Sequence, residues 1–167
     1  MKLCLLIASC ALTALAQNPM ASGTKMLWDM AKNNVLKAAE KMPEASYSFK
    51  PTPEVRSFGE IVGHVADANY AFCSADKAEK SPSTGAEKNA KTKDALIEAL
   101  KASITYCDAQ YASMTDGNAA ETRKFFGGER TRINILSFNV AHDMEHYGNL
   151  VTYMRIRGLV PPSSEGR

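Results

Sequence analysis

Four long stretches carry apolar side chains at helical spacing, and this pattern most limits what the chain can fold into. No stretch shows the alternation of apolar and polar residues, with matching turn signals, that is typical of a β-strand. Amphipathic helices of this kind bury their apolar faces against one another. The sequence therefore predicts an all-α fold, a four-helix bundle, with helices at Ser22–Lys41, Ser57–Glu79, Thr92–Met114 and Thr131–Arg157.

Local signals mark where these helices begin and end. Ser57 is followed three residues later by Glu60, the pattern of a capping box at a helix start. Met42-Pro43 ends the first helix, and Gly158 ends the last one before a pair of prolines. The polar, turn-rich stretches at 80–91 and 115–130 are expected to be loops.

Two of the predicted helices have a clear apolar stripe that we expect to face the core. In the third helix the stripe is Leu96, Ile97, Leu100, Ile104 and Cys107. In the first helix it is Met26, Leu27, Met30, Val35, Leu36 and Ala39.

The N-terminus has the pattern of a secretory signal peptide. Lys2 precedes an apolar run, and Ala14-Leu15-Ala16 is a small-x-small cleavage pattern. The run is shorter than the roughly 20 residues that a membrane span requires. A lipoprotein-type cleavage before Cys10 is a rival interpretation, disfavoured because so little of the chain precedes it. We therefore expect a signal peptide at 1–16, one exported domain at 17–167, and no stable membrane span.

Charge and cysteine content narrow the class further. The net charge is +2 with acids and bases interspersed, so the chain lacks the dense basic patch that nucleic-acid binding requires. Removal of the signal peptide leaves Cys73 and Cys107. In an exported protein these two either form a disulfide or stay as buried free thiols, and the sequence leaves both alternatives open.

All three histidines fall on partly apolar faces of two predicted helices. His142 and His146 are four residues apart, so both imidazoles project from the same side of the last helix. His64 lies in the second helix beside Ile61 and Phe72, so it should also point inward. Such inward side chains build metal sites in helical bundles, although hydrogen-bonded core histidines are the alternative. We predict His64, His142 and His146 as ligands of a divalent metal.

The stretch from His142 to His146 also fits the H-x-x-E-H pattern of inverzincin proteases, in which the glutamate is the general base. Those enzymes need a further acidic ligand far downstream, and here only Glu165 follows, in the terminal tail. An inverzincin is therefore not predicted. Glu145 remains either an acid–base group or a surface residue that supports the helix. The sequence does not single out a catalytic base among Glu145 and the other polar residues near the histidines, Asp67, Asn139, Asp143 and Asn149.

At these positions the chain resembles the DinB-like (DinB/YfiT) metal-binding four-helix-bundle family. The similarity covers 47–75, with the single histidine of the second helix, and 130–165, with the H-x-x-x-H pair and the ending "YGNLVTYMRIRGLVPPSSE". It implies an up-down-down-up bundle, a divalent metal (zinc or nickel) on the three histidines, and a homodimer.

The resemblance also implies a range of functions. The superfamily includes thiol-dependent S-transferases and proteins described as metal-dependent hydrolases. Export weakens the S-transferase hypothesis, because the low-molecular-weight thiols that such enzymes use are cytoplasmic. We expect a hydrolase or thiol transferase acting on a small-molecule substrate. The alternative is a non-catalytic metal- or ligand-binding dimeric bundle of the cell envelope.

Overall fold

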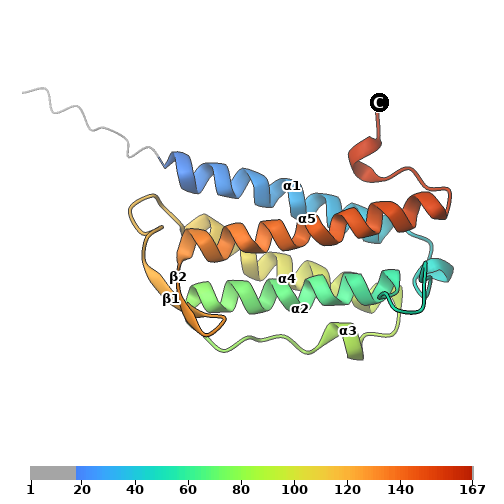
Figure 1. Cartoon of the computed structure of the whole chain (residues 1–167), viewed down its shortest axis with the longest axis horizontal. Coiled ribbons are helices and arrows are strands. Elements are labelled where there is room, and N and C mark those ends of the chain that lie inside the picture. Colours follow the sequence, from blue (N-terminus) through green and yellow to red (C-terminus); the bar gives the residue numbers. More distant parts are fainter. Residues whose placement is uncertain (1–17, 167) are drawn as a thin grey trace, which may run out of the picture.

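The computed structural model describes residues 18–166, which are mostly helical (Figure 1). The predicted signal peptide at 1–16 lies outside these residues. Four long helices dominate: α1 (Pro19–Lys41), α2 (Phe58–Lys77), α4 (Lys93–Ser113) and α5 (Arg132–Ile156). Shorter elements lie between and after them: the 3-10 turns η1 (Glu44–Ser46) and η2 (Pro162–Ser164), the short helix α3 (Ala86–Asn89), and the strands β1 (Thr122–Phe125) and β2 (Gly128–Thr131).

The four long helices pack around a shared core. Both α1 and α2 contact α4 and α5, so each long helix has two long neighbours. The connection that contains α3 runs back along the molecule beside α2, and α4 therefore runs in the same direction as α2 (Figure 1). None of the helices described is both long enough and apolar enough to cross a membrane.

The predicted starts of α2, α4 and α5 are confirmed by their capping contacts, whereas α1 begins at Pro19, before the predicted Ser22. The Ser57 hydroxyl accepts a hydrogen bond from the backbone N–H of Glu60, whose carboxylate accepts one from the N–H of Ser57. Thr92 and Thr131 cap α4 and α5 through the N–H groups three residues on. These side chains satisfy donors that would otherwise lack partners in the first helical turn.

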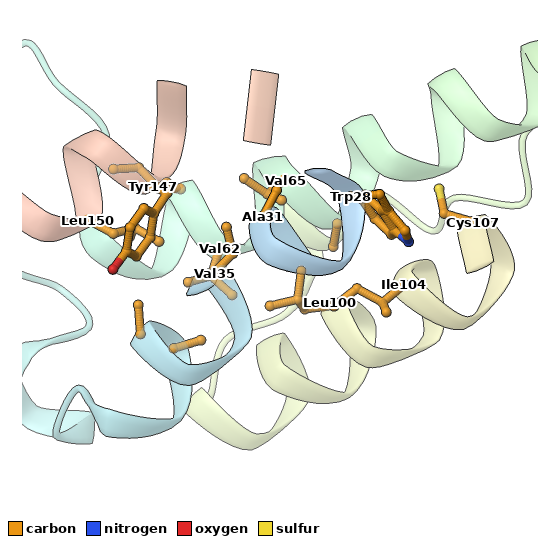
Figure 2. Packing of buried hydrophobic residues seen from close by; sticks show 14 of the residues in the cluster. Trp28, Ala31, Val35, Val62, Val65, Leu100, Ile104, Cys107, Tyr147 and Leu150 are labelled. Carbon is orange, nitrogen blue, oxygen red and sulfur yellow. The ribbon is translucent and has the colours of Figure 1, made fainter. Parts of the chain in front are cut away.

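The predicted core stripe of α1 is wrong in part. Val35 and Ala39 are fully buried, but Met26, Leu27 and Met30 are exposed. The face that packs inward consists largely of small residues around one large anchor: Ala21, Thr24, Trp28, Ala31, Val35, Ala38 and Ala39. Small side chains let the helices approach closely, and Trp28 fills the space beside Ile104 and Cys107 of α4 (Figure 2). Periodicity does not reveal which of two apolar faces achieves the closer packing.

The prediction that the chain has no strands is also wrong. Between α4 and α5 the chain forms an antiparallel hairpin in which Phe125 pairs with Gly128. Each strand is four residues long, with an exposed and half-buried pattern instead of a buried face. A strand this short and this exposed leaves no hydrophobic alternation to detect. The stretch at 80–91, expected to be a loop, likewise contains α3.

Two strong links join α2 to its neighbours. Cys73 and Cys107 form a disulfide between α2 and α4, with Cα atoms 5.3 Å apart, which resolves the alternative that the sequence leaves open. At the end of α2, Asp76 receives two hydrogen bonds of 2.9 Å from the guanidinium of Arg132 in α5. Both side chains are almost wholly buried, so each buried charge is compensated only while its partner is present.

Candidate metal centre

The three histidines of the chain converge between α2 and α5, as predicted. The Nε2 atom of His142 lies 3.2 Å from Nε2 of His64 and 3.2 Å from Nε2 of His146. All three candidate ligand atoms lie within 4.8 Å of one another. Zinc–nitrogen bonds of about 2.1 Å at tetrahedral angles place ligand nitrogens about 3.4 Å apart. The two Nε2–Nε2 distances of 3.2 Å therefore fit a single cation held between these side chains.

Glu87 orients the first of these histidines. Its Oε2 atom lies 3.0 Å from Nδ1 of His64, and its Oε1 atom accepts a hydrogen bond of 2.8 Å from Nε of Arg56. A carboxylate on Nδ1 favours the tautomer with its proton on that nitrogen, which leaves the Nε2 lone pair free for a metal. Burial raises the pKa of Glu87, but the hydrogen bonds from Arg56 and His64 outweigh it and lower the pKa overall.

Sequence reasoning missed Glu87, because it lies in the polar connection at 80–91. Only the path of that connection along α2 brings it to His64, and no spacing in the sequence indicates this contact.

Asp67 and Gly63 of α2 hold α3, and with it Glu87, in place. The carboxylate of Asp67 accepts hydrogen bonds from the N–H groups of Ala86 (2.8 Å) and Glu87 (2.9 Å). Asp67 is therefore a cap for α3 and not a group of the histidine site. Opposite Gly63, a Cβ atom would stand 2.6 Å from Cα of Glu87, so only glycine lets α3 lie this close.

The Nδ1 atoms of the other two histidines have different surroundings. The side-chain amide of Asn149 lies 3.4 Å from Nδ1 of His146. Nδ1 of His142 is buried and makes no hydrogen bond within residues 18–166, and the nearest carboxylate oxygen, on Asp143, is 3.8 Å away. Asp143 is fully buried, and this burial raises its pKa to about 6. Asn139, one turn earlier, is buried and donates to the Tyr111 hydroxyl instead of facing the histidines.

Burial also favours the neutral form of His64 and His146 by lowering the pKa of each. Desolvation lowers the pKa of His146 to about 4, with further lowering by the neighbouring histidines and Arg56. Desolvation lowers the pKa of His64 too, although Glu87 opposes that shift. A histidine with a lowered pKa is unprotonated at neutral pH, which is the form that binds a metal.

A cleft of about 580 Å³ opens beside His146, the one of the three histidines that lines it. His146 lies in its wall with other residues of α5, with residues of the connection before α2, and with one residue each from α2 and α3. The lining residues are Glu54, Val55, Arg56, Ile61, Glu87, Glu145, His146, Asn149 and Tyr153. Glu145 is exposed there and forms no hydrogen bond or ion pair with the rest of the described chain, unlike Glu87.

The fold and the site together define a class: helical proteins in which one histidine of a long helix meets an H-x-x-x-H pair of another. The chain belongs to the DinB superfamily, whose family model matches residues 27–150. This confirms the family resemblance found in the sequence. No curated protein gave a significant match to the sequence.

Solved structures of similar fold agree with this assignment. A DinB-like protein from Bacillus cereus ATCC 10987 aligns with a TM-score of 0.74 at 19% identity, covering 84% of this chain and 95% of that one. A DinB-like protein from Bacillus subtilis aligns with a TM-score of 0.68 at 23% identity, covering 90% and 100%. A mutant of a mycothiol-dependent maleylpyruvate isomerase aligns with a TM-score of 0.64 at 14% identity, covering 78% and 60%. At these identities the likeness shows the fold.

Proposed function

We propose that His64, His142 and His146 bind one divalent cation, zinc or nickel, and that the site hydrolyses a small molecule. The observation that carries this proposal is the convergence of three Nε2 atoms beside a cleft of about 580 Å³. Three nitrogen ligands leave at least one coordination position for water or substrate, which is typical of catalytic and not of structural zinc sites.

The residues around the histidines support hydrolysis. When bound, the cation would lower the pKa of a coordinated water and so supply a nucleophile near neutral pH. The acidic residues that line the cleft are Glu54, Glu87 and Glu145, and only Glu145 is next to a candidate ligand in α5. Glu87 is engaged by His64 and Arg56, whereas Glu145 has no such partner in the described chain. We assign Glu145 as the general base that takes a proton from water in the cleft.

A thiol transferase is the second candidate. One structural neighbour is described as a mycothiol-dependent isomerase, and the same three-nitrogen site would activate a thiol as readily as a water. The disulfide between Cys73 and Cys107 favours an oxidising compartment, where cytoplasmic thiols are not the expected cosubstrates. A non-catalytic metal-binding module is the third alternative, and it predicts metal binding without turnover.

We also propose the finer features that the sequence implies. The four long helices form an up-down-down-up bundle, supported by their directions in Figure 1. The mature chain is exported, supported by the N-terminal pattern and by the disulfide. The homodimer rests on the family resemblance alone, and its direct test is sedimentation equilibrium of the mature chain.

Metal content per chain tests the centre itself. The mature protein is purified from medium supplemented with zinc and nickel, and metals are measured by inductively coupled plasma mass spectrometry. We expect about one equivalent for wild type and background for a His142→Ala, His146→Ala double variant. Wild type at the background of the double variant would refute the metal centre.

The reaction class is tested on the metal-loaded protein. Panels of esters and amides, and of thiols paired with electrophiles, are compared for wild type and Glu145→Gln. We expect hydrolysis that falls at least about 100-fold in Glu145→Gln while metal content stays unchanged. Turnover only in the presence of a thiol would favour the transferase instead. Metal binding without turnover on either panel would favour the non-catalytic module.

A further inference from the structure

An aromatic cluster adjoins the histidine centre on the side away from the polar cleft. Phe72 of α2 is buried at its centre, with its ring centroid 5.3 Å from that of His142. Three more phenylalanine rings lie 5.4 to 6.2 Å from the Phe72 ring. The aromatic cluster consists of Phe72, Phe125, Phe126 and Phe138.

Two of the four rings in the aromatic cluster are exposed to solvent. Phe126 is 73% exposed and Phe138 is 47% exposed, although both belong to a cluster whose centre is buried. A chain of ring contacts thus runs from a candidate metal ligand, through the buried Phe72, to rings at the surface. An exposed apolar surface beside a reactive centre indicates a place where ligand, not protein, completes the packing.

The backbone at Phe126 is strained, and this strain bears on why a phenylalanine lies at this position. Phe126 and Gly127 form the two-residue turn of the hairpin, with φ angles of 47° and 72°. Such a turn favours asparagine or glycine at its first position, and a phenylalanine there is strained. Because asparagine would form the same turn with less strain, turn geometry does not explain the phenyl ring. Its contacts with Phe72 and Phe138 do.

The cluster, the histidines and the polar cleft lie in order along α5. Phe138, His142 and His146 are spaced four residues apart, and Asn149 and Tyr153 continue the same face into the cleft. At about 1.5 Å per residue, the Cα atoms of Phe138 and His142 are about 6 Å apart along the helix axis. A molecule held at the histidines can therefore reach the aromatic cluster through a short linker.

We propose that the aromatic cluster is an apolar subsite that binds an aromatic ring, or a similarly flat apolar group, of the substrate. The inference rests on the proposed function, because the histidine-bound cation holds the other end of the same molecule. The substrate class is a small molecule with its reacting polar group about 6 Å from such a ring. Phe126 and Phe138 contribute affinity for the ring and take no part in the chemistry.

Two matched probes isolate the contribution of the ring. Propionohydroxamate and 3-phenylpropionohydroxamate both bind a protein-held zinc through the hydroxamate and differ only by a phenyl group. Dissociation constants are measured calorimetrically on zinc-loaded protein. We expect the phenyl probe to bind wild type about ten-fold more tightly, which corresponds to burial of about 55 Å² of apolar surface.

Variants then locate the effect. Phe126→Asn suits the turn, which offsets the ring contacts that it removes, so its melting temperature should stay close to that of wild type. In a Phe126→Asn, Phe138→Ala double variant we expect the phenyl advantage to fall to about two-fold, with propionohydroxamate affinity unchanged. Ile156→Ala removes another exposed apolar side chain of α5 and serves as the control that keeps the full advantage.

Each contrary result has a distinct meaning. Equal affinity of both probes for wild type, or a phenyl advantage that survives in the double variant, overturns the subsite but leaves the metal centre standing. A chain that binds neither zinc nor propionohydroxamate overturns the proposed function and this inference together. The subsite is also wrong if the double variant abolishes binding to neutral lipid vesicles or dissociates a homodimer, because a membrane or a second copy then covers these rings.

Discussion

Substitution of Gly63 by alanine tests how the metal centre is held in shape. A Cβ atom at this position would lie 2.6 Å from Cα of Glu87 and 2.7 Å from its backbone nitrogen, whereas ordinary contacts begin at 3.4 Å. The neighbouring atoms are backbone, so they cannot rotate away, and α3 must move outward by about 0.8 Å. That shift stretches the 3.0 Å contact between Glu87 and His64 beyond hydrogen-bonding distance.

The expected loss is in metal affinity more than in stability. Groups that orient a metal-bound histidine are typically worth about 10- to 100-fold in affinity, so we expect Gly63→Ala to weaken zinc binding by that factor. Alanine in place of a helical glycine favours the helix by about 1 kcal/mol, which offsets part of the steric cost. Zinc dissociation constants are measured by competition with a chromophoric chelator, and thermal unfolding is followed by circular dichroism.

Two further variants make the test specific. Gly23→Ala adds the same methyl group to α1 at a position with no atom within 4 Å, so its zinc affinity should match wild type. Glu87→Ala removes the same hydrogen bond directly and should weaken zinc binding as much as Gly63→Ala does. The double variant should be no weaker than either single variant, because both remove one interaction. Wild-type affinity in Gly63→Ala, or losses that multiply in the double variant, would refute this reasoning.

Three further outcomes follow from the described contacts. Replacing both Cys73 and Cys107 by alanine should lower the free energy of unfolding by about 4 kcal/mol, as expected for a disulfide between residues 34 positions apart. A urea titration that shows a loss of under about 1 kcal/mol would contradict this. Asp76→Ala leaves Arg132 buried without its partner and should destabilise the protein by about 3–5 kcal/mol in the same assay. The lowered pKa of His146 keeps it neutral, so zinc affinity should fall by at most about ten-fold from pH 7 to pH 6, against about 30-fold for three histidines of ordinary pKa. A steeper fall, measured with the same chelator, would show that the site protonates like exposed histidines.

The long helices and the histidine triad were predictable because their signals are local. Ser57, Thr92 and Thr131 cap helices at the expected positions, since capping depends on residues three apart in sequence. His142 and His146 share a helix face for the same reason. Predicting that His64 lies close to these two histidines required one further assumption, that the inward faces of the helices pack into one core.

Features that depend on the path of the chain were missed. The hairpin that carries Phe125 and Phe126 is too short for its pattern to be detected, and it packs through aromatic contacts with Phe72. Three exposed residues of α1, Met26, Leu27 and Met30, were assigned to its core face together with the buried Val35 and Ala39, because both faces contain apolar residues. Which face packs inward depends on the shapes of the neighbouring helices.

The sequence by itself determined four long helices and three histidines on inward faces, since helical periodicity and caps act over a few residues. Tertiary structure alone decided that Glu87 supports His64 and that Asp67 caps α3 instead of serving the site. Tertiary structure also decided that Cys73 pairs with Cys107. These contacts join residues 19 to 34 positions apart. Their formation depends on how the connection after α2 returns along that helix, which no local pattern specifies.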